Sequence, residues 1–184
     1  MAAPPAPRYT YDDLERFPDD NLRRELIGGE LIVTPAPRPS HQEIADELTY
    51  RLRAYTKTHG GRANSAPLDV VFAPADVVEP DVVFLTAQRL HLVGERYIEG
   101  PPDVVVEVSS PSTRHLELVR KRDLYERYGV AEYWYVDLDA ERIAVHRLTG
   151  DRYADPTFVP RGDVLESPLL PGFSLPVAEL FDLA

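Results

Sequence analysis

The chain has 184 residues, of which 43% are hydrophobic and 28% charged, a composition typical of one globular domain with a sizeable core. It contains no cysteine, which excludes disulfides and thiolate metal sites and fits a reducing cytoplasm. The formal net charge of -11 disfavours proteins whose affinity depends on neutralising many phosphates, so a nucleic-acid role needs a local basic groove.

The N-terminal region is expected to begin with a flexible arm. Residues 1–8 read MAAPPAPR, and residues 9–184 contain no repeat and no linker that would divide a single domain. We find no charged-then-apolar leader and no apolar run near the roughly 18 residues of a membrane span, so export and membrane insertion are not expected. Thr10 and Asp13 form a capping-box pattern, which predicts a short helix over Tyr11 to Phe17.

A hairpin and a long helix are predicted next. Arg24 to Val33 contains two short strand-like segments around Gly28-Gly29, residues that tolerate the positive φ of a tight turn. Ser40 and Glu43 form a second capping-box pattern. The apolar residues that follow at helical spacing predict a helix ending near Gly60-Gly61: Ile44, Leu48, Leu52 and Tyr55.

The rest of the chain alternates between strand-like and helix-like segments. A second helix is predicted over Leu116 to Tyr128, and a last short one near Val177 to Phe181, in an irregular tail that starts at Asp151. Together the segments predict an α/β fold, with a mixed, strongly curved central sheet, the hairpin beside it and the longer helices on its faces. The predicted strands are Leu68 to Phe72, Val77 to Leu85, Asp103 to Val108, Glu132 to Val136 and Ile143 to Leu148.

Two acidic residues interrupt segments that are otherwise suited to burial. In DVVVEVS, strand alternation places Glu107 on the face opposite Val106 and Val108, and in EPDVVFL Asp81 starts another valine-rich run. A carboxylate in such a place is costly unless a cation or several hydrogen bonds accompany it. Two acids entering an apolar sheet from adjacent strands would make an oxygen-rich site suited to Mg²⁺.

The second predicted helix supplies a cation for these acids. At about 100° per residue, Leu118, Lys121, Tyr125 and Tyr128 share one arc of the helix. Lys121 is one of two lysines in a chain whose other 18 cations are arginine. A lysine on an apolar face either extends to its edge or meets a buried acid, and only the turn-forming segment SSPSTRH separates Val108 from this helix. Lys121 and Glu107 are therefore positioned to meet.

Structural interpretations of the same residues stay open. Glu107 and Lys121 could form only a buried ion pair that maintains one packing arrangement. Asp81 could terminate a loop after Pro80. Asp103 shares a face with Glu107 and is a rival ligand, although it directly follows two prolines and is more simply a strand-entry residue.

The combined motifs resemble a known family. Pro80-Asp81, PPDVVVEVSSPST, Lys121 with Tyr125, and GVAEYWYVD are similar to the Uma-type restriction endonuclease-like family of the PD-(D/E)XK nuclease superfamily. The resemblance extends upstream to ELIGGELIVTPAP and His41 and downstream to LLPGFSLPVAELF, covering nearly the whole chain from Tyr9. It implies a restriction endonuclease-like core, hydrolysis of DNA and, as in similar nucleases, a homodimer.

The resemblance also implies the roles of individual residues. Asp81, Glu107 and the Val108 carbonyl would hold Mg²⁺ or Mn²⁺, which would polarise a phosphodiester and activate a water. In the superfamily a lysine stands two positions after the second acid, but here Ser109 occupies that position. The resemblance implies that Lys121 substitutes, positioning the water or stabilising the pentacovalent charge.

Two upstream residues match further positions of the family. Glu25 could ligate a second ion or orient water, and His41 could contact phosphate. The structural alternatives are a solvent-exposed ion pair of Glu25 with Arg23 or Arg24, and an exposed His41 at the start of a helix.

Three functional hypotheses follow. The leading one is a Mg²⁺- or Mn²⁺-dependent endonuclease that hydrolyses DNA phosphodiester bonds. The second, motivated by the net charge of -11, is a non-catalytic binding or assembly protein that retains the nuclease fold. The third is an enzyme acting on a smaller phosphate ester at the same site.

Overall fold

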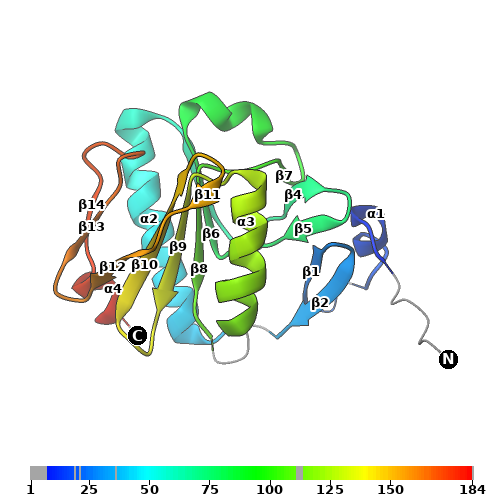
Figure 1. Cartoon of the computed structure of the whole chain (residues 1–184), viewed down its shortest axis with the longest axis horizontal. Helices are drawn as coiled ribbons and strands as arrows, with labels where there is room; N and C mark the ends of the chain where they lie inside the picture. The colour runs from blue at the N-terminus through cyan, green and yellow to red at the C-terminus, as the bar shows by residue number, and fades with distance from the viewer. Residues whose placement is uncertain (1–7, 19, 21, 36, 111–113, 184) are drawn as a thin grey trace.

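A mixed β-sheet with a helix on each face forms the centre of the molecule (Figure 1). The computed structural model describes residues 8–18, 20, 22–35, 37–110 and 114–183, so the arm predicted for residues 1–8 lies, except for Arg8, outside the described residues. The helices are α1 (Tyr11–Leu14), α2 (Pro39–His59), α3 (Arg122–Tyr128) and α4 (Ala178–Phe181), with a 3₁₀ segment at Ala87–Leu92 and a π-helix at Leu116–Lys121. The strands are β1 (Arg23–Ile27), β2 (Glu30–Thr34), β3 (Arg62–Ser65), β4 (Val70–Ala73), β5 (Asp76–Val78), β6 (Val82–Leu85), β7 (Ile98–Glu99), β8 (Val104–Val108), β9 (Glu132–Asp137), β10 (Arg142–Thr149), β11 (Arg152–Tyr153), β12 (Thr157–Pro160), β13 (Val164–Glu166) and β14 (Ser174–Pro176).

The larger sheet has the strand order β11-β10-β9-β8-β6-β3, with β12 also pairing with β10. β8 and β9 run parallel, and the other pairs are antiparallel. A parallel pair requires a crossover connection, and the chain makes it through the π-helix and α3. The prediction of a mixed α/β sheet with the longer helices on its faces is confirmed.

Strand alternation divides the core into two layers. Val104, Val106 and Val108 of β8 belong to the apolar cluster that includes Leu48 of α2, whereas Val105 belongs to the cluster on the side of α3. Glu107 shares the parity of Val105 and therefore points to the α3 side. Burial of a valine or leucine side chain contributes about 1.5–3 kcal/mol to folding. A shift of the strand by one residue would move every side chain to the opposite face, so the buried valines determine the face of β8 that Glu107 occupies.

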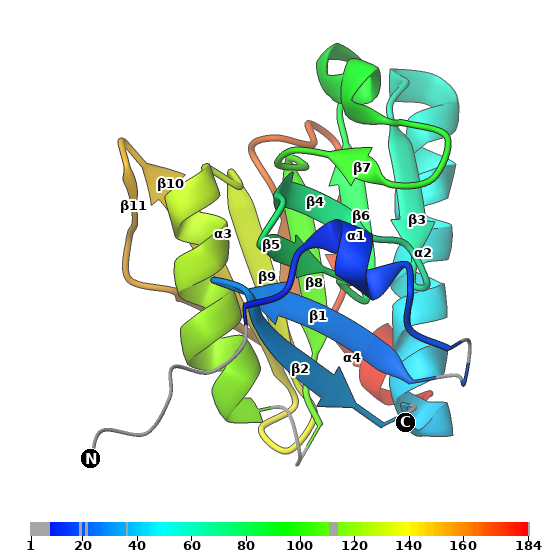
Figure 2. The same ribbon diagram turned by 90° about the vertical axis from the view of Figure 1, so that its right-hand side faces the viewer.

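The hairpin belongs to a second sheet, with the order β2-β1-β5-β4-β7, which lies beside the larger one (Figures 1 and 2). Gly28 and Gly29 turn the chain with φ of 60° and 78°, and Ile27 pairs with Glu30 across them. Two successive positive φ values match the right-handed twist of a two-residue hairpin. The hairpin prediction is confirmed. Pairing of Leu26 with Val77 ties it to β5.

The predicted strand over Val77 to Leu85 is wrong as a single element. β5 ends at Val78 and β6 begins at Val82, and the two strands belong to different sheets. Pro80 lies between them, and it has no N–H to donate to a ladder. The break brings Glu79 and Asp81 to the place where the two sheets meet.

The two predicted longer helices differ from the prediction, the first in the residue at which it begins and the second in its number of residues per turn. α2 begins at Pro39, with Arg38 as the N-cap and no side-chain cap, so the capping box of Ser40 and Glu43 does not form. Proline is well suited to the first helical turn because its missing N–H would have had no partner there. The predicted uniform helix over Leu116 to Tyr128 contains the π-helix, which has more residues per turn than the assumed wheel.

The remaining differences are in short elements. α1 ends at Leu14 instead of Phe17, although the Asp13 carboxylate accepts hydrogen bonds from the N–H and hydroxyl of Thr10 at 2.9 Å each, as the capping-box pattern predicts. The prediction missed β3, β7 and the strands of the C-terminal tail, which the structure places in β11, β12, β13 and β14. Strands of two to four residues are too short for alternation to be recognised.

Candidate active site

Four carboxylates and two cations meet where the two sheets adjoin. Their side chains come from β1, from the connection between β5 and β6, from β8 and from the helix before α3: Arg23, Glu25, Glu79, Asp81, Glu107 and Lys121. Exposed fractions are 1% for Glu25, 2% for Asp81, 0% for Glu107 and 2% for Lys121. Charged groups buried to this depth require partners, because desolvation of each ion is costly.

Asp81 and Glu107 are neighbours across two adjacent strands. β6 and β8 are antiparallel, and Val82 pairs with Val106. Extended by one residue, this register places Asp81 opposite Glu107. Oδ2 of Asp81 accepts the backbone N–H of Val108 at 2.8 Å. The three positions implied as metal ligands therefore lie together at one end of the β6–β8 pair.

Lys121 lies between two glutamates. Its Nζ is 2.7 Å from Oε1 of Glu25 and 2.9 Å from Oε1 of Glu107. Tyr125, one helical turn further on, donates its hydroxyl to the same Glu107 oxygen at 2.5 Å. Glu25 Oε1 also accepts the N–H of Glu79 at 2.8 Å. Glu25 therefore does not form the solvent pair with Arg23 or Arg24 that its structural alternative assumes.

Asp81 is surrounded by donors. Both terminal nitrogens of Arg23 donate to Oδ1 at 3.0 Å, and His41 Nε2 lies 3.0 Å from Oδ2, the oxygen that also accepts the Val108 N–H. His41 is 7% exposed, so it is not the exposed residue at a helix start that its structural alternative assumes. Nε of Arg23 donates to Oε1 of Glu79 at 2.8 Å, which attaches this cluster to the β5–β6 connection.

Burial and neighbouring charges move the pKa values of the two acids in opposite directions. Burial, together with the charges of Asp81 and Glu25, raises the pKa of Glu107 to about 7 against the opposing charge of Lys121. Burial alone would raise the pKa of Asp81, but the hydrogen bond from His41 and the charge of Arg23 outweigh it and lower that pKa to about 2. The surroundings thus favour the ionised form of Asp81, whereas burial makes Glu107 hold a proton more readily than a free glutamate does.

Lys121 keeps its proton in this environment. Burial alone would lower the pKa of Lys121, but the charges of Glu107 and Glu25 outweigh it and raise the pKa. A permanently protonated ammonium can donate hydrogen bonds and stabilise negative charge, but it cannot act as a general base.

Two carboxylate oxygens in the site have no hydrogen-bond partner. Oε2 of Glu25 and Oε2 of Glu107 are both buried and unpaired. When all four carboxylates are ionised they exceed the two cations by two charges, which one divalent cation would balance. Hard divalent cations prefer such oxygen ligands, so the donor set fits Mg²⁺ or Mn²⁺. In the part of the chain that the structure describes, no group of three or more His, Cys, Asp or Glu side chains is already arranged around a common metal position.

The site opens to solvent beside Arg23 and Asp81. A recess of about 210 Å³ is lined by Arg23, His41 and Asp81 together with polar residues of α2 and β3. A second recess of about 460 Å³ is lined by Arg23, Arg24 and Glu79. Arg23 lines both recesses, whereas the fully buried Glu107 lines neither.

The rival ligand Asp103 lies away from the site, whereas two residues that were not predicted, Tyr125 and Arg23, belong to it. Asp103 lies at the other end of β8, where Oδ2 accepts the Thr86 N–H at 2.6 Å and Oδ1 lies 3.1 Å from Nε of Arg89. Tyr125 and Arg23 were not predicted as site residues. The signal for Arg23 was its spacing of two from Glu25 on a strand, which places both side chains on one face.

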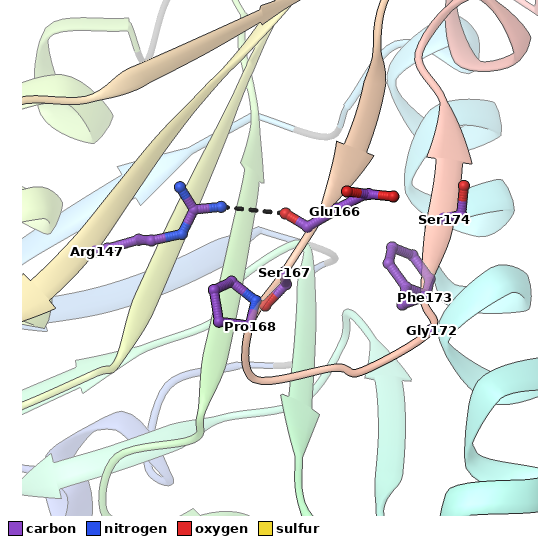
Figure 3. Close-up of a pocket in the computed structure, with 7 residues that line it drawn as sticks. All are labelled: Arg147, Glu166, Ser167, Pro168, Gly172, Phe173 and Ser174. Atoms are coloured by element: carbon purple, nitrogen blue, oxygen red, sulfur yellow. Dashed lines mark hydrogen bonds between the residues drawn. The ribbon is translucent and has the colours of Figure 1, made fainter.

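The C-terminal part of the chain forms a larger recess of about 490 Å³, seen in Figure 3. Arg147 borders it, but its guanidinium is held by Oε1 of Glu132 at 3.0 Å and by the carbonyl of Glu166 at 3.1 Å. The other lining residues are Ser167, Pro168, Gly172, Phe173 and Ser174. This recess has no converging carboxylates and no buried lysine, so the chemistry indicated by the charged cluster lies elsewhere.

Comparisons with known proteins identify a matching family and a similar solved structure. The family model Uma2, described as "Putative restriction endonuclease", matches residues 10–178. A crystal structure described as that of a "putative nuclease belonging to DUF820" from Anabaena variabilis is similar with a TM-score of 0.79 and 20% sequence identity, over 95% of this chain and 98% of that one. No curated protein matches. Among the helices that the structure describes, none has the length and apolarity required to cross a bilayer.

Proposed function

This chain belongs to the Uma2 family of putative restriction endonucleases, and on that premise we propose that it is a metal-dependent endonuclease that hydrolyses DNA phosphodiester bonds. Asp81, Glu107 and the Val108 carbonyl would hold Mg²⁺ or Mn²⁺, and Lys121 would assist the attacking water. Glu25 and His41 complete the pocket. Support comes from the family, from the nuclease-like fold and from the fit of the charged cluster to a divalent cation.

The carboxylates supply what a divalent cation requires. Glu107 and Glu25 each keep one buried oxygen without a partner, and the donors around Asp81 lower its pKa, which favours the charged form. When bound, the ion would supply Lewis-acid polarisation of the phosphodiester and would lower the pKa of a coordinated water. Every other role in the proposal falls to side chains of this chain.

Lys121 is the residue that we assign to the reacting atoms. Its Nζ is held within 2.9 Å of Glu25 and Glu107, in a setting that keeps it charged. A preorganised buried cation stabilises developing negative charge more strongly than one in water, because little solvent screens it. Lys121 would orient the attacking water through a hydrogen bond and stabilise the pentacovalent phosphate.

His41 and Arg23 occupy the side from which substrate would approach. Both line the recess of about 210 Å³ that reaches Asp81. His41 Nε2 is engaged with Asp81, and its buried Nδ1 has no partner. We assign His41 to a phosphate contact, in agreement with the position it matches in the family.

One observation carries this proposal: a buried lysine bridges two buried glutamates, and each glutamate keeps one oxygen unpaired. The experiment that tests it incubates the purified chain with single- and double-stranded DNA in Mg²⁺ and in Mn²⁺, beside Glu107→Ala. Cleavage by the unaltered chain alone is the expected result. If neither protein cuts any DNA under any divalent metal, the endonuclease proposal is wrong.

A second function is favoured by the charge of the protein. The net charge is -11, and both cations of the site are already paired with carboxylates. A non-catalytic binding or assembly protein that retains the nuclease fold would have these properties. Mn²⁺ titration separates the two, because only the endonuclease requires ion binding that depends on Glu107. A smaller phosphate ester as the substrate would be identified by screening such esters with the same site variants.

Three further expectations stay predictions: a homodimer, a cytoplasmic location and a single domain over residues 9–184. The homodimer follows from the resemblance to similar nucleases and is tested by sedimentation of the purified chain.

A further inference from the structure

Arg23 holds one oxygen, Oδ1, of Asp81, a residue that lines the smaller recess. A carboxylate offers roughly four acceptor positions, two on each oxygen. The two terminal nitrogens of Arg23 take those of Oδ1, and the Val108 N–H and His41 take those of Oδ2. Asp81 is therefore saturated with donors, in contrast to Glu25 and Glu107.

This saturation conflicts with a role for Asp81 in holding a divalent ion. The unpaired oxygens of Glu25 and Glu107 are free to take a cation as they stand. Asp81 can join them only after one of its donors leaves, because a coordinating oxygen and a hydrogen-bonded one use the same lone pairs.

Of the donors to Asp81, Arg23 is the one most easily displaced. The Val108 N–H belongs to the backbone of β8, in the interior of the larger sheet. His41 belongs to α2, and its side chain is 9% exposed. The Arg23 side chain is 18% exposed and lines both recesses beside the site. Its guanidinium thus borders solvent-accessible space.

Glu79 would keep the released guanidinium close to the site. Nε of Arg23 donates to Oε1 of Glu79 at 2.8 Å, independently of the two nitrogens that reach Asp81. With Nε still held, the terminal nitrogens could turn from Asp81 to the recess. There they would present the paired N–H groups with which arginine binds phosphate in a bidentate manner.

We infer that Arg23 is an exchangeable cation of the site, which competes with the divalent ion for Asp81 and, when displaced, binds a backbone phosphate of the substrate. This inference rests on the proposed function and assigns Arg23 a regulatory and substrate-binding part in it. Its consequence is coupling: occupation of the metal site strengthens DNA binding by freeing Arg23, and without the ion the same arginine neutralises Asp81.

The test is a Mn²⁺ titration by calorimetry, without DNA, of four proteins: the unaltered chain, Arg23→Met, Arg23→Lys and Arg114→Met. Arg114 is the matched control, because both of its terminal nitrogens also donate to a buried aspartate, Asp137, at 3.0 and 2.9 Å. Arg23→Met should bind Mn²⁺ about tenfold more tightly, a typical coupling between competing ligands. Arg23→Lys keeps the charge and should fall between, and Arg114→Met should match the unaltered chain.

A second measurement follows the guanidinium after displacement. Binding of a short DNA duplex should be strengthened by Ca²⁺ in the unaltered chain and in Arg114→Met, but not in Arg23→Met. If Arg23→Met does not fold, the side-chain ¹⁵N signals of Arg23 in the unaltered chain must shift during Mg²⁺ titration, while those of Arg114 stay in place. An unchanged Arg23 signal would overturn the inference.

The outcomes separate this inference from the proposed function. If the unaltered chain binds Mn²⁺ through Glu107 and Arg23→Met binds it no more tightly, the ion does not displace Arg23 from Asp81. The inference is then wrong, whereas the proposed metal site is still supported. If the unaltered chain and Glu107→Gln both bind no Mn²⁺, the proposed metal-dependent function is wrong, and the inference about Arg23 is wrong as well.

Discussion

The ammonium of Lys121 lies 2.9 Å from Oε1 of Glu107, and the two side chains are 2% and 0% exposed. This pair is compatible with a purely structural role, because buried ion pairs also maintain packing. What distinguishes it is the unpaired second oxygen of Glu107, since a pair that served only the fold would leave a buried acceptor unsatisfied at a cost of about 1–3 kcal/mol. The first three predictions separate these roles.

Replacement of Lys121 should remove cleavage while metal binding persists. We expect Lys121→Ala to lower the rate of DNA cleavage by about 10²–10³-fold, because a preorganised charge beside the reacting phosphate is lost. Lys121→Arg should also fail, since a planar guanidinium does not fit the space of an ammonium. Cleavage assays and Mn²⁺ titration measure the two effects. Lys57→Ala, at the exposed lysine of α2, is the control.

An unfolded Lys121→Ala protein would instead favour the structural role. Removing one partner of a buried ion pair typically costs about 3–5 kcal/mol, because the other charge stays buried alone. Thermal unfolding, measured beside the cleavage assay, distinguishes loss of chemistry from loss of fold.

Replacement of Glu107 by its neutral isostere should weaken metal binding and leave the chain folded. Glu107→Gln keeps the shape of the side chain but loses the charge that a hard cation requires. The control is Glu132→Gln, since Glu132 is also buried on a neighbouring strand but contacts Arg147 and Trp134 instead. Calorimetry with Mn²⁺ should show weaker binding for Glu107→Gln only. Equal weakening by both variants would mean that the effect comes from general destabilisation.

Removal of the Tyr125 hydroxyl should weaken metal binding by releasing Glu107. The hydroxyl donates to Oε1 at 2.5 Å and so leaves Oε2 as the oxygen without a partner. Tyr125→Phe should lower the free energy of unfolding by about 1.5–3 kcal/mol, the value of a hydrogen bond to a charged group. Tyr133→Phe loses a longer bond of 3.2 Å to the Glu117 carbonyl and is the matched control. Unchanged Mn²⁺ affinity in Tyr125→Phe would contradict an orienting role.

Acid should destabilise the protein through His146. This side chain is 6% exposed and stacks on Tyr133, and burial and the charge of Arg122 lower its pKa from 6.5 to about 4. The unfolded chain therefore binds a proton between pH 6.5 and 4 that the folded chain does not, so stability is complete above pH 6.5 and falls as the pH decreases.

His146→Phe isolates this contribution, because phenylalanine keeps the stacked ring but does not titrate. Between pH 7 and pH 4 the unaltered chain should lose on the order of 2 kcal/mol more than the variant, after allowance for screening by solvent. Urea unfolding at both pH values measures the difference. Parallel loss in the two proteins would assign the acid sensitivity to other groups.

Patterns that repeat within a few residues allowed much of the fold and part of the site to be predicted. Alternation along β8 predicted which face takes Glu107, and helical spacing predicted that Lys121 faces inward. Lys121 and Glu107 meet although a π-helical segment ends at Lys121, and the α-helical spacing from Lys121 to Tyr125 brings the Tyr125 hydroxyl to the same glutamate. Short strands such as β3 escaped prediction because two to four residues carry too little pattern.

What the sequence by itself determined is the set of side chains that each element turns toward the core, because that choice depends on backbone geometry and on burial of neighbouring residues. Only the tertiary structure decided which charges meet. Arg23 and Asp81 are 58 positions apart and come together because the hairpin joins a second sheet at the break after β5. A contact of this kind depends on how two sheets pack, and no local pattern encodes it.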